Sequence, residues 1–274
     1  MLRKFPRQIG AKRMYYPNVK TADEKILRAF TTYPYLTSEQ LTRLLYRKGS
    51  AHYVSAKLKS LTKQKLLHRL ERETINFPYV YCLGIRGIRY RQALGCDIAL
   101  FHPSEHTTHK PLFVHHTLAV NDFLIAAATL PTIAPAISVH DIKHDLTLKH
   151  TRTPVIPDGW IDFRLNEKTQ LCIWLEMDMG TMDQKPIRKK ISSLIDFSRQ
   201  SYEQVFGTPS LTIVFATTAG QGQVRATWQS VSTSQMAESP CRDVTPGVYL
   251  PAAMMLCAIH SLLAIAETQK EIPS

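Results

Sequence analysis

Residues 50–61 read SAHYVSAKLKSL, a stretch in which small and apolar residues recur at intervals of three and four. This spacing puts the apolar positions on one face of a helix, where they would be buried. Those positions are Ala51, Val54, Leu58 and Leu61. The opposite face is polar and carries Ser50, His52, Tyr53, Lys57 and Lys59. The stretch therefore predicts a helix with one buried face and one exposed, cationic face.

The flanking sequence predicts two shorter helices before this one and a β-hairpin after it. Thr21 and Glu24 form a capping-box pattern for the first helix, and Thr37 is suited to cap the second. Residues 66–70 and 79–83 have the composition of short strands, joined by a polar loop. Three helices followed by a hairpin are the order of a winged helix-turn-helix, here over residues 21–95. In that fold the third helix enters the major groove of DNA.

Positive charge is concentrated in this part of the chain. The whole sequence has a net charge of +12, but residues 1–100 carry +14 and residues 101–274 carry −2. A basic segment joined to a nearly neutral body is typical of a protein that binds a polyanion. We therefore expect double-stranded DNA as the partner, with residues 1–20 as a flexible basic arm. The expected contact residues are Ser50, His52, Tyr53, Lys57, Lys59, Arg69 and Arg72.

The second half of the chain has the pattern of an α/β domain. Residues 96–111 are polar and rich in histidine, and are predicted to be a linker to a domain over residues 112–274. Apolar runs predict strands at residues 136–139, 158–165, 171–175 and 211–216. Helical patterns cover residues 116–130, 185–202, 221–233 and 251–268. This order predicts an α/β (α+β) fold with a mixed sheet.

Three carboxylates fall at the ends of predicted strands. Asp158 opens one strand, and Glu176 and Asp178 close the next, two residues apart and so on the same strand face. Clustered carboxylates suit Mg²⁺ or Mn²⁺, which activate water against a phosphodiester. The arrangement resembles the PD-(D/E)xK nuclease core, except that Asp178 occupies the lysine position. A lysine of the next helix, Lys189 or Lys190, could replace it.

Two interpretations of this cluster stay open. One is an endonuclease in which Asp158, Glu176 and Asp178 hold the metal and Lys189 stabilises charge. The other is an inactive, degenerate nuclease-like core, and we lean towards a protein that is not an enzyme. Without nuclease activity no cofactor is expected.

Several segments together resemble the replication-relaxation family. They are the predicted N-terminal winged helix, His116-x4-Asn121-Asp122, Pro157-Asp158-Gly159, Glu176-Met177-Asp178-Met179-Gly180-Thr181, the helix with Lys189 and Lys190, LTIVFATT at 211–218, and Arg225. The resemblance covers roughly residues 20–235. It implies an accessory DNA-binding protein of a plasmid or mobile element, acting in replication initiation or in relaxation for mobilisation. A replication or relaxase protein would then be a partner. A module for protein interaction or transcription regulation is the alternative that needs no such pathway.

The remaining features bear on compartment and assembly. Five scattered cysteines argue against a disulfide framework, and the N-terminus has no apolar signal segment. The longest apolar run, residues 251–266, is short for a bilayer span. We expect a cytoplasmic protein that does not enter a membrane. The apolar run is either core or a dimerisation face, which leaves a homodimer open.

Overall fold

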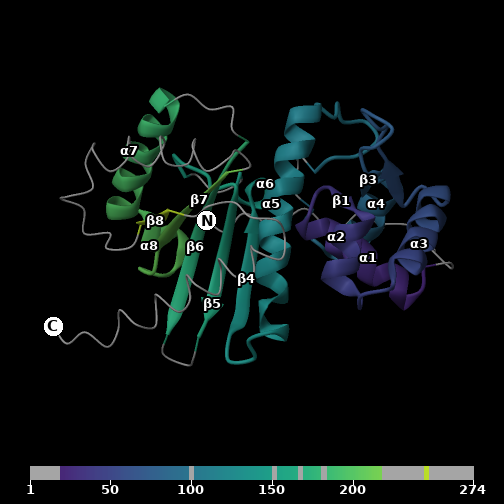
Figure 1. Cartoon of the computed structure of the whole chain (residues 1–274), viewed down its shortest axis with the longest axis horizontal. Coiled ribbons are helices and arrows are strands. Elements are labelled where there is room, and N and C mark those ends of the chain that lie inside the picture. Colours follow the sequence, from purple (N-terminus) through teal and green to yellow (C-terminus); the bar gives the residue numbers. More distant parts are fainter. Residues whose placement is uncertain are drawn as a thin grey trace, which may run out of the picture.

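The chain folds into a mixed α/β structure with two β-sheets (Figure 1). The structure is a computed structural model, and it describes residues 19–98, 102–149, 153–165, 169–179, 184–217 and 244–246. In chain order its elements are α1 (Thr21–Thr32), β1 (Leu36–Thr37), α2 (Ser38–Leu45), α3 (Ala51–Lys63), β2 (Leu67–Arg69), β3 (Val80–Leu83), α4 (Ile85–Ala93), α5 (Pro111–Thr129), η1 (Leu130–Thr132), β4 (Ser138–His144), α6 (Asp145–Leu148), β5 (Gly159–Arg164), β6 (Gln170–Asp178), α7 (Gln184–Gln200), α8 (Tyr202–Phe206), β7 (Thr212–Thr217) and β8 (Val244–Pro246). The α/β class and the mixed sheet are confirmed.

Residues 19–98 form a small unit, here named the N-terminal module. Its three strands pair antiparallel in the order β1-β3-β2, and α1, α2 and α3 pack around a shared core. Of the four predicted inward positions of α3, Val54, Leu58 and Leu61 are fully buried in that core. The prediction was wrong for Ala51, which is exposed in the first turn of the helix. The observed order is a helix, a short strand, two helices and a hairpin.

The start of α2 agrees with the prediction from the sequence, and the start of α1 differs from it. Thr37 caps α2 as predicted: its Oγ1 accepts the Gln40 N–H at 3.1 Å, and the Gln40 Oε1 accepts the Thr37 N–H at 3.1 Å. The start of α1 is different, because Lys20 is the N-cap and Asp23 accepts the Lys20 N–H at 3.0 Å. The capping-box prediction at Thr21 was therefore wrong by one residue, with Asp23 taking the part assigned to Glu24.

The larger sheet has the strand order β4-β5-β6-β7-β8. Strands β4, β5 and β6 pair antiparallel, whereas β7 and β8 are parallel to β6, since α7 carries the chain back across one face. Side chains alternate between the faces as the two-residue period requires. Ile161 and Ile173 face the core that includes α5, and Trp160 and Trp174 face α7 and α8. The predicted strand at 136–139 begins two residues later and is longer, ending at His144.

Helix α5 stands between the larger sheet and the N-terminal module (Figure 1). Leu124 and Ile125 belong to one continuous core that also includes Phe30 of α1 and Leu175 of β6. The helix together with η1 is long and apolar enough to cross a membrane by length and composition, but most of it is buried within the protein. Its apolar character is therefore explained by its position between two layers.

The predicted linker, which the structure describes at residues 96–98 and 102–111, is buried at residues 102–104. His102 is buried, and its Nε2 lies 2.7 Å from the Phe30 carbonyl oxygen of α1. The Tyr35 hydroxyl lies 2.9 Å from the His109 Nδ1. These contacts hold the segment against the N-terminal module.

Some predictions lie outside the described residues. These are the basic arm up to residue 18, the helices at 221–233 and 251–268, and Arg225.

Candidate functional site

The exposed face of α3 carries three of the seven residues predicted to meet DNA, namely His52, Tyr53 and Lys59. His52, Tyr53, Lys59 and Lys63 are exposed, and Tyr53 retains 45% of its surface. His52, Lys59 and Lys63 recur at helical spacing, so they form one stripe opposite the buried Val54 and Leu58. Ser50 is the N-cap of α3 and is half-buried, and its side chain makes no capping hydrogen bond.

Lys57 differs from the other cations of α3. Its Nζ lies 2.8 Å from Oδ1 of Asp23, a side chain of α1 that is only 6% exposed. The hydrogen bond to Asp23 is the main reason that the pKa of Lys57 is raised. Lys57 is thus directed to α1 within its own module, where it neutralises a buried carboxylate, and the sequence did not predict this partner.

The hairpin presents two arginines beside an aromatic ring. The guanidinium carbons of Arg69 and Arg72 lie 4.5 and 4.4 Å from the centre of the Tyr79 ring, within the range of a cation–π interaction. Arg72 also donates to the Ile75 carbonyl oxygen at 2.7 Å. We call residues 70–79 the wing loop; Ile75 near its tip is 81% exposed.

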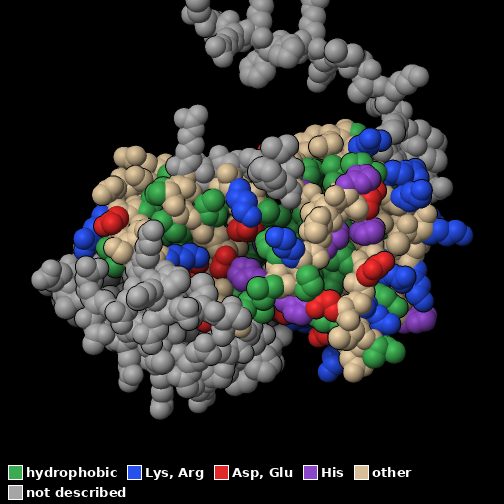
Figure 2. Space-filling model, turned by 90° about the horizontal axis from the view of Figure 1, so that it is seen from above, with side chains coloured by type: hydrophobic (Ala, Val, Ile, Leu, Met, Phe, Trp, Pro, Cys, Tyr) green, Lys and Arg blue, Asp and Glu red, His purple; other side chains and the backbone are tan. Residues whose placement is uncertain are grey.

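Two acidic side chains of the module are paired with cations of the same module: Asp23 with Lys57 and Glu24 with Arg91. A third, Glu73, lies 2.8 Å from the His115 Nε2 of α5. The exposed cations are therefore not balanced by these carboxylates. Figure 2 shows Lys and Arg side chains gathered at the end of the molecule that this module forms.

A second group of polar residues lies where β5 begins and β6 ends. The Asp158 Oδ2 accepts the Met177 N–H at 2.7 Å and lies 3.4 Å from the His116 Nε2 of α5. Burial alone would lower the pKa of His116, but its hydrogen bond to Asp158 raises it. Asp158 is thus held by the sheet backbone and by α5.

Glu176 is the most deeply buried carboxylate of this group, with 4% of its side chain exposed. Its Oε1 accepts the indole N–H of Trp174 at 2.8 Å, and its Oε2 is paired with the ammonium of Lys190 from α7. Burial raises the pKa of Glu176 to about 7, and the charge of Asp158 adds to the rise while Lys190 opposes it. For Lys190, burial lowers the pKa, but Glu176 and Asp158 raise it overall.

The structure therefore brings Asp158, Glu176 and Lys190 together. Asp178 ends β6 beside Thr217 of β7 and is half-buried. The side chain of Lys189 lies outside the described part of the structure, so the lysine seen at the carboxylates is Lys190, the other residue that the sequence offered. In the described ranges no three His, Cys, Asp or Glu side chains lie close enough together to hold a metal ion. Since both Glu176 oxygens are engaged by Trp174 and Lys190, these residues as placed do not fit a Mg²⁺ or Mn²⁺ site.

The polar residues of α5 join the two halves of the chain. Asn121 donates to the Tyr35 carbonyl oxygen, and Asp122 accepts from Gln40 at 3.0 Å and pairs with Arg43. His116, on the same helix, contacts Asp158. The spacing His116-x4-Asn121-Asp122 was the signal for these residues, but only the fold shows that they connect α5 to both neighbours.

The sequence model of the replication-relaxation family matches residues 27–208, from α1 to the loop after α8. No curated protein and no solved structure matches the chain. Because the family match takes in more than half of the 274 residues, the chain belongs to the replication-relaxation family.

Proposed function

We propose that the chain binds double-stranded DNA through the N-terminal module, acting as a winged helix. In this proposal α3 enters the major groove and the wing loop lies along the neighbouring backbone. Family membership points to a role in replication or relaxation. We therefore propose an accessory DNA-binding factor in replication initiation or relaxation of a plasmid or mobile element, in the cytoplasm.

The observation that carries the proposal is the exposed cationic stripe of α3. Lys59 and Lys63 are exposed on the face opposite the module core, whereas Asp23 and Glu24 are paired internally. Arg69 and Arg72, stacked near Tyr79, extend the positive surface to the hairpin. In this proposal phosphate contacts by such side chains supply affinity, and the exposed His52 and Tyr53 contact base edges.

Salt dependence tests this proposal. With about four phosphate contacts, the logarithm of the association constant should fall with the logarithm of salt concentration with a slope of about −4. Between about 50 and 200 mM salt this amounts to a loss of roughly 200-fold in affinity. Fluorescence anisotropy with a labelled duplex and the full chain measures it. Affinity that does not change with salt would refute a phosphate-based interface.

We propose that Asp158 and Glu176 have a structural role, within a degenerate nuclease-like core. The ammonium of Lys190 and the indole of Trp174 already satisfy the Glu176 oxygens, and Asp158 accepts a backbone N–H of β6. These contacts attach α7 to β6 and β6 to the start of β5.

Plasmid integrity tests that assignment against endonuclease activity. Supercoiled plasmid incubated with the protein and Mg²⁺ or Mn²⁺ should stay intact. Cleavage by the wild-type chain that is lost in Asp158→Ala would show the opposite, and gel electrophoresis distinguishes the two results.

A further inference from the structure

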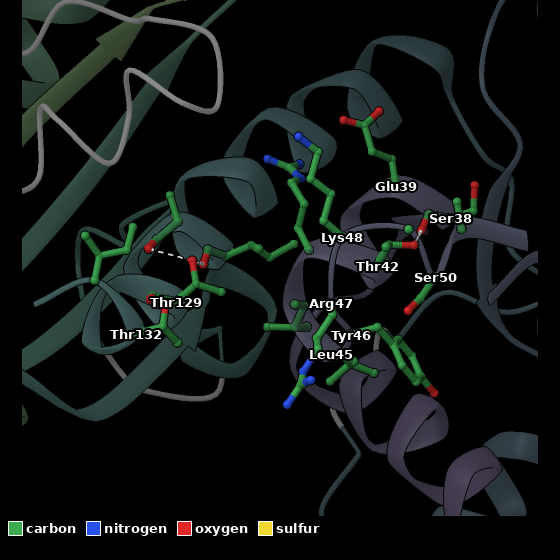
Figure 3. A pocket seen from close by; sticks show the side chains of 17 residues that line it. Ser38, Glu39, Thr42, Leu45, Tyr46, Arg47, Lys48, Ser50, Thr129 and Thr132 are labelled. Atoms are coloured by element: carbon green, nitrogen blue, oxygen red, sulfur yellow. Dashed lines mark hydrogen bonds between the residues drawn. The ribbon is translucent and has the colours of Figure 1, made fainter. Parts of the chain in front are cut away.

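A wide groove lies between the N-terminal module and the end of α5. Its volume is about 1210 Å³, and we name it the α2–α5 groove. Figure 3 shows its two sides: Leu45, Arg47 and Lys48 come from α2 and the α2–α3 connection, and Thr129 and Thr132 come from α5 and η1. The groove is distinct from the stripe of Lys59 and Lys63 on α3 and from the wing loop, since neither contributes to its lining.

The lining includes several apolar side chains. Leu44 and Leu45 are half-buried on one side, and Ile125 and Ala126 are buried on the other. Ile133, which follows η1, is 62% exposed at the edge. An apolar groove of this size with an exposed isoleucine is typical of a surface that binds another protein.

The volume fits one helix. A cylinder of about 10 Å diameter and the same volume is about 15 Å long, which corresponds to roughly ten helical residues. A single amphipathic helix laid along the groove would cover the apolar side chains of both walls.

The charges around the groove indicate the chemistry of that helix. Arg47 and Lys48 are exposed in the lining, and Lys25 donates to the Leu45 carbonyl oxygen at 3.0 Å beside it. Arg43, also in the lining, is paired with Asp122. Glu39 is the acidic residue among the lining side chains, so cations outnumber it.

We propose that the α2–α5 groove docks an acidic amphipathic helix of a partner protein. Its apolar stripe would contact Ile125 and Ile133, and its carboxylates would face Arg47 and Lys48. DNA fits less well, because phosphates gain nothing from the apolar walls. The two surfaces would allow the protein to hold DNA and a protein partner at once.

Selection from a displayed library of random 16-residue peptides tests this proposal, because the selection requires no candidate partner. We expect peptides retained by the full chain to combine apolar residues spaced by three and four with an excess of Asp and Glu. Ile133→Asp should weaken their binding at least 10-fold in anisotropy measurements. Arg47→Glu with Lys48→Glu should weaken it at least 5-fold, and lysine-substituted versions of the peptides should bind this variant better than the wild-type chain.

The control is Arg89→Glu, at an exposed residue of α4 outside the groove lining, which should leave peptide affinity unchanged. Three results would overturn the proposal. One is retention of the peptides by Ile133→Asp with full affinity. The second is loss of duplex binding in Ile133→Asp, which would assign the groove to DNA. The third is self-association of the wild-type chain in sedimentation that Ile133→Asp abolishes, which would assign the groove to a second copy.

Discussion

Replacing Lys59 and Lys63 by glutamate should reduce duplex affinity at least about 100-fold at moderate salt, because two phosphate contacts become repulsive. Both side chains are exposed on one stripe of α3 and lie opposite its buried residues, so the substitutions should leave the fold intact. Anisotropy with a labelled duplex measures the loss. The slope of affinity against salt should become shallower by about two, one for each contact removed.

The control reverses one charge on the far side of the larger sheet. Arg199 of α7 is exposed, so Arg199→Glu changes net charge as much as Lys59→Glu does. If the interface is on α3, the single change at Lys59 should weaken binding about 10-fold and the change at Arg199 much less. Equal losses would mean that total charge, and not α3, governs binding. Unchanged melting temperatures verify that both variants fold.

Lys57 is unsuitable for this test, although it lies on the same helix two residues before Lys59. Its partner Asp23 is nearly inaccessible, so Lys57→Glu would set two carboxylates together inside the module and would affect stability. A helical pattern gives the direction in which a side chain points from the axis of its own helix. It does not show that α1 supplies a carboxylate there, and so the sequence could place Lys59 on the surface but not assign Lys57 to Asp23.

Helices and strands with long apolar patterns could be predicted from the sequence. Short strands that form only because a neighbouring strand pairs with them could not. Helix α3 follows from apolar residues that repeat on one face, and β5 and β6 follow from continuous apolar runs that are buried on both faces. The two-residue β1 and the three-residue β8 exist because a neighbouring strand pairs with them. The segment around His102 looks polar in sequence, yet it is buried because its ring bonds to the backbone of α1. Burial of this kind depends on tertiary contacts, which composition does not reveal.

In the cluster of Asp158, Glu176 and Lys190, tertiary contacts likewise decide one residue that the sequence left open. Spacing places Glu176 on the strand face that α7 covers, and it suggested a lysine of the following helix. Neighbouring residues on a helix point about 100° apart, so only the rotation of α7 against the sheet decides between Lys189 and Lys190. That rotation is fixed by Leu194 and Phe197, which pack on Trp174 and its neighbours.

Removing the ammonium of Lys190 should destabilise the protein at alkaline pH. In Lys190→Met only the Trp174 N–H opposes a charge on the buried Glu176 carboxyl, so at pH 8 this group either stays charged without its cation or takes up a proton. Since the wild-type pKa is about 7, protonation limits the cost at pH 8 to roughly 1.4 kcal/mol of the free energy of unfolding. Urea unfolding at pH 8, followed by tryptophan fluorescence, measures the loss. The double variant Glu176→Gln with Lys190→Met removes both charges and should recover most of the stability, because no buried ion remains.

The loss should also depend on pH, and its sign follows from the pKa of Glu176. Burial raises that pKa from 4.5 to about 7, so the folded state holds the proton more tightly than the unfolded chain does. The stabilisation linked to this proton is fully present below pH 4.5 and is lost as the pH rises through 7. Without Lys190 the pKa of Glu176 rises further, so at pH 5 the carboxyl group is neutral and Lys190→Met should cost clearly less than at pH 8. An equal cost at both pH values, or a double variant as unstable as the single one, would show that Lys190 contributes through packing and that its charge does not stabilise Glu176.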